Sequence, residues 1–95
     1  MNRLRITNNS IVQRKNDLLF NEIDGETVLM SIRNSEYYGL NKVGSRIWQL
    51  LEDPIAVKSI ISKLLDEYEI SYNQCFDDTL DFLTILDEKK ILSVN

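Results

Sequence analysis

The feature that most constrains the fold is a change in hydrophobic period near Leu40. Before this residue, short segments rich in β-branched and aromatic residues alternate with a period close to two, which predicts strands. After it, apolar residues recur every three or four positions, which predicts helices. The stretch from Glu36 to Leu51 (EYYGLNKVGSRIWQLL) contains the change, with Asn41 as a predicted helix N-cap at the junction. The sequence therefore predicts an α+β domain in which the strands come first.

Three predicted strands form an antiparallel meander. They cover residues 18–24, 26–33 and 36–40. Asp24–Gly25 is a strong two-residue hairpin signal between the first two strands, and Asn34–Ser35 predicts the second turn. Residues 11–13 (IVQ) are a candidate for a further short strand. The final ILSV, residues 91–94, is a candidate for a segment that turns back toward the sheet.

Three helices are predicted after the strands. The first carries Trp48 on its apolar side, together with Gly44, where close packing of another element is expected. The second is expected to begin at Asp53–Pro54, an N-cap followed by proline at the first helical position. The third follows the S-x-x-Q capping box that begins at Ser71, and it continues to about Glu88.

Length and composition favour one small domain. The 95 residues contain no internal repeat and no Pro/Gly-rich linker. We expect residues 1–10, which are polar, to be flexible and residues 11–95 to form a single domain. There is no run of 18 apolar residues and no apolar segment typical of a signal peptide, and the single Cys allows no internal disulfide. We therefore predict a cytoplasmic protein that does not enter the membrane.

The charge is unevenly distributed along the chain. The net charge is −4, but residues 1–15 carry four basic side chains and no acid. The remainder carries seven Lys or Arg against fifteen Asp or Glu. A body this acidic repels nucleic acid phosphates and attracts basic ligands, although acidic side chains also simply keep small domains soluble. We therefore predict no nucleic acid partner.

The residue types that most enzyme sites need are missing. The chain has no His and a single Cys, Cys75, which excludes Ser-His-Asp and Cys-His arrangements and ordinary zinc sites. Cys75 lies on the apolar side of the third predicted helix, where a small core residue is expected. Asp77, Asp78 and Asp81 are expected to form a solvated acidic face, because a cation site needs additional oxygen ligands from a loop. We predict no catalytic residue, no metal and no cofactor.

The third predicted helix carries more apolar surface than one core contact requires. On a wheel of about 100° per residue, the expected core stripe consists of Cys75, Thr79, Phe82 and Leu86. A second stripe consists of Phe76, Leu80 and Leu83. The whole apolar arc spans roughly 220°, about twice what packing on one side needs. We expect the second stripe to be uncovered, the alternative being that a neighbouring strand or the C-terminal tail covers it.

The third predicted strand is an edge of the meander. Its residues are Glu36, Tyr37, Tyr38, Gly39 and Leu40. None of them is Pro or Lys, the residues that commonly protect edge strands. An undefended edge beside spare apolar helix surface is what peptide binding by strand addition requires. The predicted peptide-binding residues are these five together with Phe76, Thr79, Leu80 and Leu83, although Tyr38 and Leu40 are also expected to contribute to the core.

Over residues 18–94 the sequence resembles the PqqD-like proteins, which are also known as RiPP precursor peptide recognition elements. The resemblance rests on the order and spacing of LNKVGSRIW, the helical pair that follows, and DFLTIL. Within the family it is most similar to the stand-alone recognition protein of lasso peptide pathways, because of IWQLLEDP, DEYEIS and Cys75. One departure is Lys90, where the family often has Gly, so a different geometry is expected at the end of the third helix.

The resemblance implies a winged helix-turn-helix-like fold and binding of the leader region of a ribosomally made precursor peptide as an added strand. It also implies two enzyme partners, a transglutaminase-like cysteine leader peptidase and, less directly, an ATP-dependent lasso cyclase. A PqqD-like adaptor for a radical-SAM or other peptide-modifying pathway remains an alternative. A winged-helix DNA-binding protein is disfavoured, because the third helix would be its recognition helix and carries five acidic side chains against one Lys.

Overall fold

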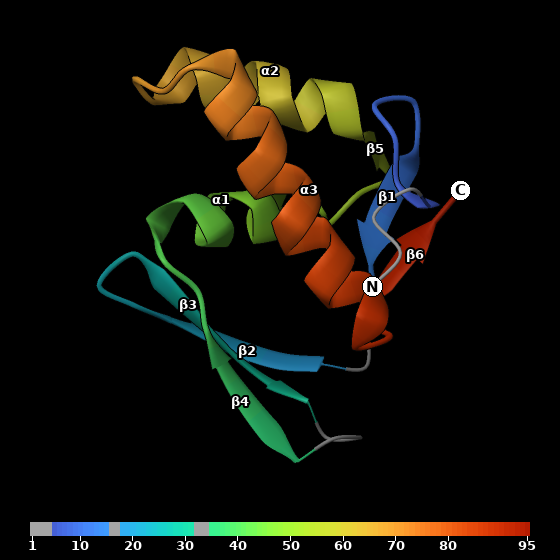
Figure 1. The fold of residues 1–95 in the computed structure, drawn as a ribbon. Coiled ribbons are helices and arrows are strands. Elements are labelled where there is room, and N and C mark those ends of the chain that lie inside the picture. Colours follow the sequence, from blue (N-terminus) through green and yellow to red (C-terminus); the bar gives the residue numbers. More distant parts are fainter. Residues whose placement is uncertain (1–4, 16–17, 32–34) are drawn as a thin grey trace.

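The structure is a computed structural model and describes residues 5–15, 18–31 and 35–95. The elements are β1 Ile11–Arg14, β2 Leu18–Ile23, β3 Glu26–Ser31, β4 Glu36–Gly39, α1 Lys42–Leu50, β5 Ile55–Ala56, α2 Val57–Glu67, α3 Tyr72–Glu88 and β6 Leu92–Val94. The predicted α+β class, with a three-stranded antiparallel sheet followed by three helices, is confirmed (Figure 1). Residues 32–34, which contain the end of the predicted second strand and the first residue of the turn at Asn34–Ser35, lie outside the described residues.

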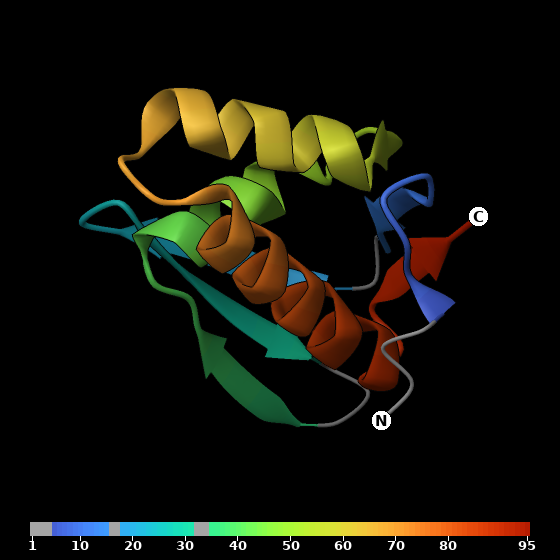
Figure 2. The same cartoon turned by 45° about the horizontal axis from the view of Figure 1, so that its top comes forward.

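The predicted meander forms a sheet in the order β2–β3–β4. Asp24 and Gly25 have φ values of 55° and 80°, which a two-residue hairpin turn of this kind requires. In the register of β3 and β4, Leu29 faces Tyr38 and Met30 faces Tyr37. The helices lie on one side of this sheet, and β2 and β4 are its two outer strands (Figure 1, Figure 2). Within the described part of the chain, β4 is therefore an edge strand, as the sequence predicted.

The two faces of this sheet have different surroundings. Along β3, Thr27, Leu29 and Ser31 are buried against the helices, whereas Val28 and Met30 are half-buried on the opposite face. On the outer face, the side chains of Leu19, Ile23 and Tyr37 are exposed. Side chains thus alternate between the two faces of the sheet, as predicted, but the outer face of the sheet is apolar as well as the inner face.

A second small sheet has β1 at its centre, in the order β5–β1–β6. The candidate strand at residues 11–13 is confirmed, but the C-terminal segment pairs with β1 and not with the meander. Ile55–Ala56 pairs with the other edge of β1. This pairing keeps the chain extended as far as Ala56, which is the N-cap of α2. The prediction that this helix begins at Asp53–Pro54 is therefore wrong.

Arg14 connects the two sheets. Its guanidinium carbon lies 4.7 Å from the centroid of the Phe20 ring and 5.0 Å from that of the Trp48 ring. The same group donates a hydrogen bond of 2.9 Å to the backbone oxygen of Trp48. The two rings meet edge to face, with centroids 5.8 Å apart, and Trp48 is fully buried as predicted. A partly desolvated cation–π contact contributes about 1 kcal/mol, so Arg14 stabilises the junction of β1, β2 and α1.

The junction between β4 and α1 is held by two side chains. Asn41 is the predicted N-cap, and its Oδ1 accepts a 2.8 Å hydrogen bond from the Gly44 amide. The buried hydroxyl of Ser45 accepts a 2.7 Å bond from the Thr27 amide and donates a 3.2 Å bond to the backbone oxygen of Leu40. Ser45 therefore links α1, β3 and the residue that follows β4.

Residues 5–10, part of the N-terminus that the sequence predicts to be flexible, pack against the body of the domain in this structure. Ile6 is 2% exposed and belongs to the core. The backbone oxygens of Asn8 and Ser10 accept hydrogen bonds from the amides of Lys58 and Val57, at 3.1 and 3.0 Å. These bonds use amides at the first turn of α2, which have no partner within their own helix.

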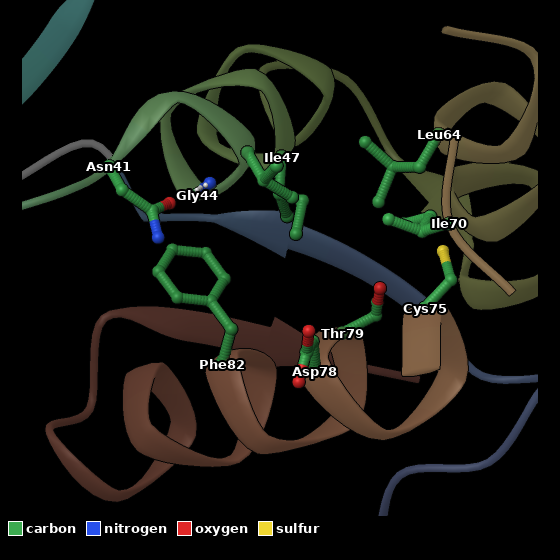
Figure 3. A pocket seen from close by; sticks show the side chains of 10 residues that line it. Asn41, Gly44, Ile47, Leu64, Ile70, Cys75, Asp78, Thr79 and Phe82 are labelled. Carbon is green, nitrogen blue, oxygen red and sulfur yellow. Dashed lines mark hydrogen bonds between the residues drawn. The ribbon is translucent and has the colours of Figure 1, made fainter. Parts of the chain in front are cut away.

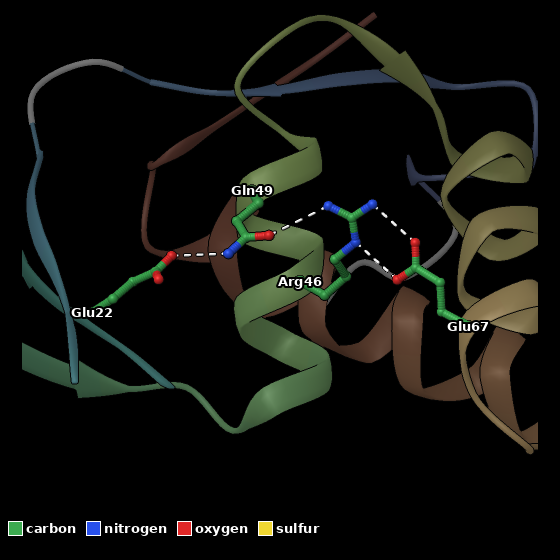
Figure 4. A network of polar contacts seen from close by, with 4 residues as sticks. All are labelled: Glu22, Arg46, Gln49 and Glu67. Carbon is green, nitrogen blue, oxygen red and sulfur yellow. Dashed lines mark hydrogen bonds and ion pairs between the residues drawn. The ribbon is translucent and has the colours of Figure 1, made fainter. Parts of the chain in front are cut away.

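A polar network on the surface orients α1 against its neighbours (Figure 4). Arg46 donates two hydrogen bonds, of 2.8 and 2.9 Å, to the carboxylate of Glu67 at the end of α2. Gln49 contacts Arg46 and donates a 2.8 Å bond to Glu22 of β2. The hydrogen bond from Arg46 lowers the pKa of Glu67. Because the pair is largely solvated, it contributes little stability but defines the orientation of α1.

No helix in the described residues is long and apolar enough to cross a membrane.

We predict that Ser45→Ala destabilises the fold more than its size suggests. The Thr27 amide is buried at this hydrogen bond and loses its acceptor, which costs about 1–3 kcal/mol. Urea unfolding would measure the change, with Ser62→Ala on the exposed face of α2 as the matched control. A loss of stability no larger than that of the control would show that Ser45 does not hold this junction.

Candidate functional site: a groove between β4 and α3

A groove of about 360 Å³ separates β4 from the C-terminal half of α3. It is lined by Tyr38, Gly39, Leu40, Phe82, Ile85, Leu86, Lys89 and Ile91. The lining is mainly apolar, and Ile85 is 43% exposed although its side chain is large and aliphatic. Exposed apolar surface in a groove is a common property of binding sites.

The end of α3 is fixed by a helix-capping motif that also places Lys89. The amide of Ile91 donates to the Leu86 oxygen and the amide of Lys90 to the Asp87 oxygen, both at 3.0 Å. Lys90 has a φ of 64°. These are the bonds and the left-handed residue of a Schellman motif. The expectation that Lys90 would change the helix ending is therefore wrong, because the lysine adopts the conformation that glycine usually takes.

The backbone of β4 presents unpaired hydrogen-bonding groups on its outer side. The Leu40 amide donates a 2.8 Å bond to the Thr27 oxygen, so it points toward β3. In an antiparallel ladder, residues alternate between the two sides of the strand. Tyr38 therefore also points its backbone groups toward β3, whereas Tyr37 and Gly39 point theirs away from the sheet. A peptide lying beside β4 has two amides and two carbonyls to pair with.

One end of the groove is bridged by a charged side chain. The Lys89 Nζ lies 4.7 Å from the centroid of the Tyr38 ring, so it spans the distance from α3 to β4. The Tyr38 hydroxyl donates a 2.9 Å hydrogen bond to Glu36. Lys89 is the charged residue of the groove lining.

At its other end, the groove meets a pocket of about 330 Å³ between α1 and α3 (Figure 3). Phe82 lines both spaces. A side chain at Gly44 would place its Cβ 3.2 Å from Asn41 and 3.5 Å from the Phe82 ring, so glycine permits this close approach. The Thr79 hydroxyl is buried in the pocket wall.

The residues predicted to bind a peptide lie in different parts of the structure. Tyr38, Gly39 and Leu40 line the groove, and Thr79 lines the adjoining pocket. Glu36 contacts Tyr38, and Tyr37 is 71% exposed on the outer face. The remaining three residues of the prediction are Phe76, Leu80 and Leu83.

The prediction that Phe76, Leu80 and Leu83 form an uncovered stripe beside the edge strand is wrong. Leu83 is fully buried and Leu80 is 5% exposed. Leu80 and Phe76 border a depression formed with residues 6–9, on the side of α3 away from β4. The N-terminal segment thus lies beside Phe76 and Leu80, whereas Leu83 belongs to the core. Direct contact of these residues with a peptide remains a prediction, but they do not line the groove at β4.

The α3 side of the groove differs from the one predicted from the sequence. Phe82 was expected in the core, and Ile85 and Lys89 were not considered as site residues. With Asp78 in the adjoining pocket, these residues follow a spacing of four, three and four positions, which is one face of a helix. This spacing predicts that the four residues share one face of α3, and the buried face of the helix then shows that theirs is the one that borders the groove.

Metal binding and thiol chemistry are not favoured by the described side chains. No group of three His, Cys, Asp or Glu among them is placed to hold a metal ion. Cys75 is buried as predicted, and burial raises the pKa of its thiol, so the thiolate is disfavoured. The groove can bind a chain segment through backbone bonds and apolar contacts.

Comparison with known proteins identifies the family. Residues 26–92 match the family of coenzyme PQQ synthesis protein D (PqqD). The chain belongs to the PqqD family. The family relationship expected from the sequence is thereby confirmed. No curated protein matches the chain.

Two solved structures resemble this PqqD-family protein. The structure of TbiB1 in complex with the TbiA(beta) leader peptide has a TM-score of 0.77 and 33% sequence identity, and covers 85% of this chain and 94% of that chain. The structure of lasso peptide synthetase B1 complexed with the leader peptide has a TM-score of 0.74 and covers 86% of this chain and 96% of that chain. Its sequence identity is 24%, so this second likeness concerns the fold alone.

We predict opposite roles for two aliphatic residues of α3. Leu80→Ala should lower the free energy of unfolding by about 2–4 kcal/mol, because it removes buried methyl groups and leaves a cavity. Ile85→Ala should change it by less than about 1 kcal/mol, because Ile85 already contacts water. Urea unfolding of both variants tests this assignment. Equal destabilisation by the two would mean that the groove face of α3 has been placed incorrectly.

Proposed function

We propose that this protein binds the leader region of a ribosomally made precursor peptide, of the lasso peptide class, as an additional strand on β4. It then presents the peptide to processing enzymes without catalysing a step itself. The observation that carries the proposal is the free edge of β4 beside an apolar groove on α3. The 33% identical relative, TbiB1, is a leader peptide complex of the same fold, which supports the same role here.

The groove must supply much of the binding energy. A micromolar complex requires about −8 kcal/mol. Pairing with Tyr37 and Gly39 gives four backbone hydrogen bonds at about 1 kcal/mol net each. Two leader side chains buried against Phe82 and Ile85 add about 1.5–3 kcal/mol each, before the cost of ordering the peptide is subtracted. Backbone pairing alone is therefore insufficient, and the leader must place apolar side chains at positions that face the groove.

The proposed enzyme partner is a transglutaminase-like cysteine leader peptidase, with an ATP-dependent lasso cyclase acting later. Support for a docking surface comes from the outer face of the sheet, where Leu19, Met30 and Tyr37 lie in one cross-strand row. Such an exposed apolar face is typical of interaction surfaces. A leader strand on β4 would extend this row by one strand, so an enzyme could contact the adaptor and the peptide together.

The absence of catalysis in this protein is supported by its composition and by the burial of its thiol. The chain contains no His, and Cys75 is buried with a raised pKa. Peptide cleavage and acyl transfer usually need a nucleophile paired with a base, and His, the most common such base, is missing from the sequence.

Membership of the PqqD family also suits a second pathway, because the matching family is described by its role in coenzyme PQQ synthesis. In that alternative the same groove would hold the substrate peptide of a different modifying enzyme. The similarity to TbiB1 favours the lasso class.

We predict that Gly39→Pro folds but loses leader binding. The Gly39 amide points away from β3, so proline removes a donor that only an added strand uses. Calorimetric titration with the leader of the precursor peptide encoded beside this chain should show affinity reduced about tenfold or more. Gly39→Ala keeps the amide and has open space for its Cβ, so it should bind like the unchanged protein.

Tyr38→Pro provides the complementary control. It removes an amide that points toward β3, so it should damage folding itself. If Gly39→Pro is folded and binds the leader as tightly as Gly39→Ala, binding by strand addition on β4 is wrong. If the unchanged protein does not bind the leader at all, the proposed function itself is wrong.

A further inference from the structure

The groove face of α3 carries opposite charges at its two ends. Asp78 lines the pocket beside Asn41, and Lys89 lines the groove beside Tyr38. Phe82 and Ile85 lie between them on the same helical face. The two charged residues are eleven positions apart, which corresponds to roughly 16 Å along the helix axis.

A free edge strand does not by itself determine how a peptide binds. It can pair with a partner in either direction, and the pairing can shift by two residues without changing which side chains face the groove. The apolar centre of this groove, formed by Phe82 and Ile85, gives no direction either. A charged group at each end supplies the asymmetry that backbone pairing lacks.

We propose that Asp78 and Lys89 select the direction and register of the bound peptide. The peptide would carry a cationic side chain toward Asp78 and an acidic side chain toward Lys89, with an apolar side chain between them. This inference rests on the proposed function and specifies the class of peptide that the groove accepts.

The geometry of a strand fixes the spacing of the two charges. Strands rise about 3.4 Å per residue, and every second side chain faces the groove. Groove-facing side chains four to six residues apart therefore span roughly 14–20 Å, which matches the separation on α3. β4 runs from the Lys89 end of the groove toward the Asn41 end. A peptide antiparallel to β4 then carries its cation four to six residues before its acidic residue.

Desolvation explains why Lys89 favours an acidic partner. Its ammonium group already lies over the Tyr38 ring, between the two walls of the groove. A strand placed on β4 would remove water from this ammonium, and a buried charge without a partner is unfavourable. Glu36 accepts the Tyr38 hydroxyl and is exposed on β4, so solvent screens its attraction for Lys89. A carboxylate from the peptide would neutralise Lys89, as charge pairs at interface rims do when they set register.

Asp78 has the corresponding role at the other end. It lies on the exposed side of α3 and accepts a 2.8 Å hydrogen bond from the Gln74 side chain. This bond orients the carboxylate and leaves its charge intact. A cationic side chain entering over Phe82 would reach the carboxylate from the groove.

Charge exchange between protein and peptide tests the inference. The probe is the leader peptide used above, with each acidic residue changed singly to Lys and each basic residue singly to Glu. Replacement of one acidic residue should weaken binding to the unchanged protein about five- to tenfold, the scale of a rim charge pair. Lys89→Glu should restore that affinity. A basic residue of the leader, four to six positions before this acidic residue, should behave in the same way. Its replacement by Glu should weaken binding to the unchanged protein, and Asp78→Lys should restore the affinity.

The matched controls are Lys90→Glu and Asp77→Lys, which change the same charges at neighbouring positions outside the groove lining. Neither control variant should restore the affinity of any charge-changed peptide. If the leader binds but no position exchanges with Lys89 or Asp78, or if the controls rescue equally, the inference is overturned and the proposed function stands. If the leader does not bind the unchanged protein, both fall together.

Discussion

The site depends most on the two hydrogen bonds of the Ser45 hydroxyl. This hydroxyl occupies the place where the ladder between β3 and β4 would otherwise continue, accepting from the Thr27 amide and donating to the Leu40 oxygen. Because Ser45 belongs to α1, one buried side chain fixes the end of the edge strand relative to the helices. Asn41 caps α1 immediately before it. The position of β4, and with it the width of the groove, follows from these few hydrogen bonds.

The two sides of α3 show how the domain leaves one edge open without leaving all its apolar surface exposed. On one side, residues 6–9 border Phe76 and Leu80, Leu80 is buried, and Arg5 forms a 2.8 Å ion pair with Asp87. On the other side, Phe82 and Ile85 border β4 without a covering segment among the described residues. An uncovered edge strand is an aggregation risk. Here the edge is four residues long.

The strands and helices could be predicted because each has a local signal. The Asp24–Gly25 turn, the Asn41 cap and the Ser71 cap all appear as expected. The start of α2 could not be predicted, because the pairing of Ile55–Ala56 with β1 is a long-range contact that overrides the local proline signal.

The failure at α3 has a similar physical cause. Its apolar arc is too wide to identify a single buried face. Cys75, Thr79 and Leu86 are buried as expected, but the buried arc also includes Leu80 and Leu83, and Phe82 is only half-buried. The buried side of α3 packs against α2 and β6, and Ile6 lies beside Phe76 and Leu80. These contacts join segments that are far apart in the sequence. Alternation along the strand predicts the β4 side of the groove, whereas the α3 side depends on this long-range packing.

Amide hydrogen exchange of β4, measured residue by residue by NMR with and without the leader peptide, tests the central claim most directly. The Tyr37 and Gly39 amides point away from β3 and should exchange rapidly in the free protein. Saturating leader should slow both by about tenfold or more, because an added strand would accept their hydrogen bonds. The Tyr38 amide, already directed at β3, should change much less. Unchanged exchange at Tyr37 and Gly39 with leader bound would contradict strand addition on β4.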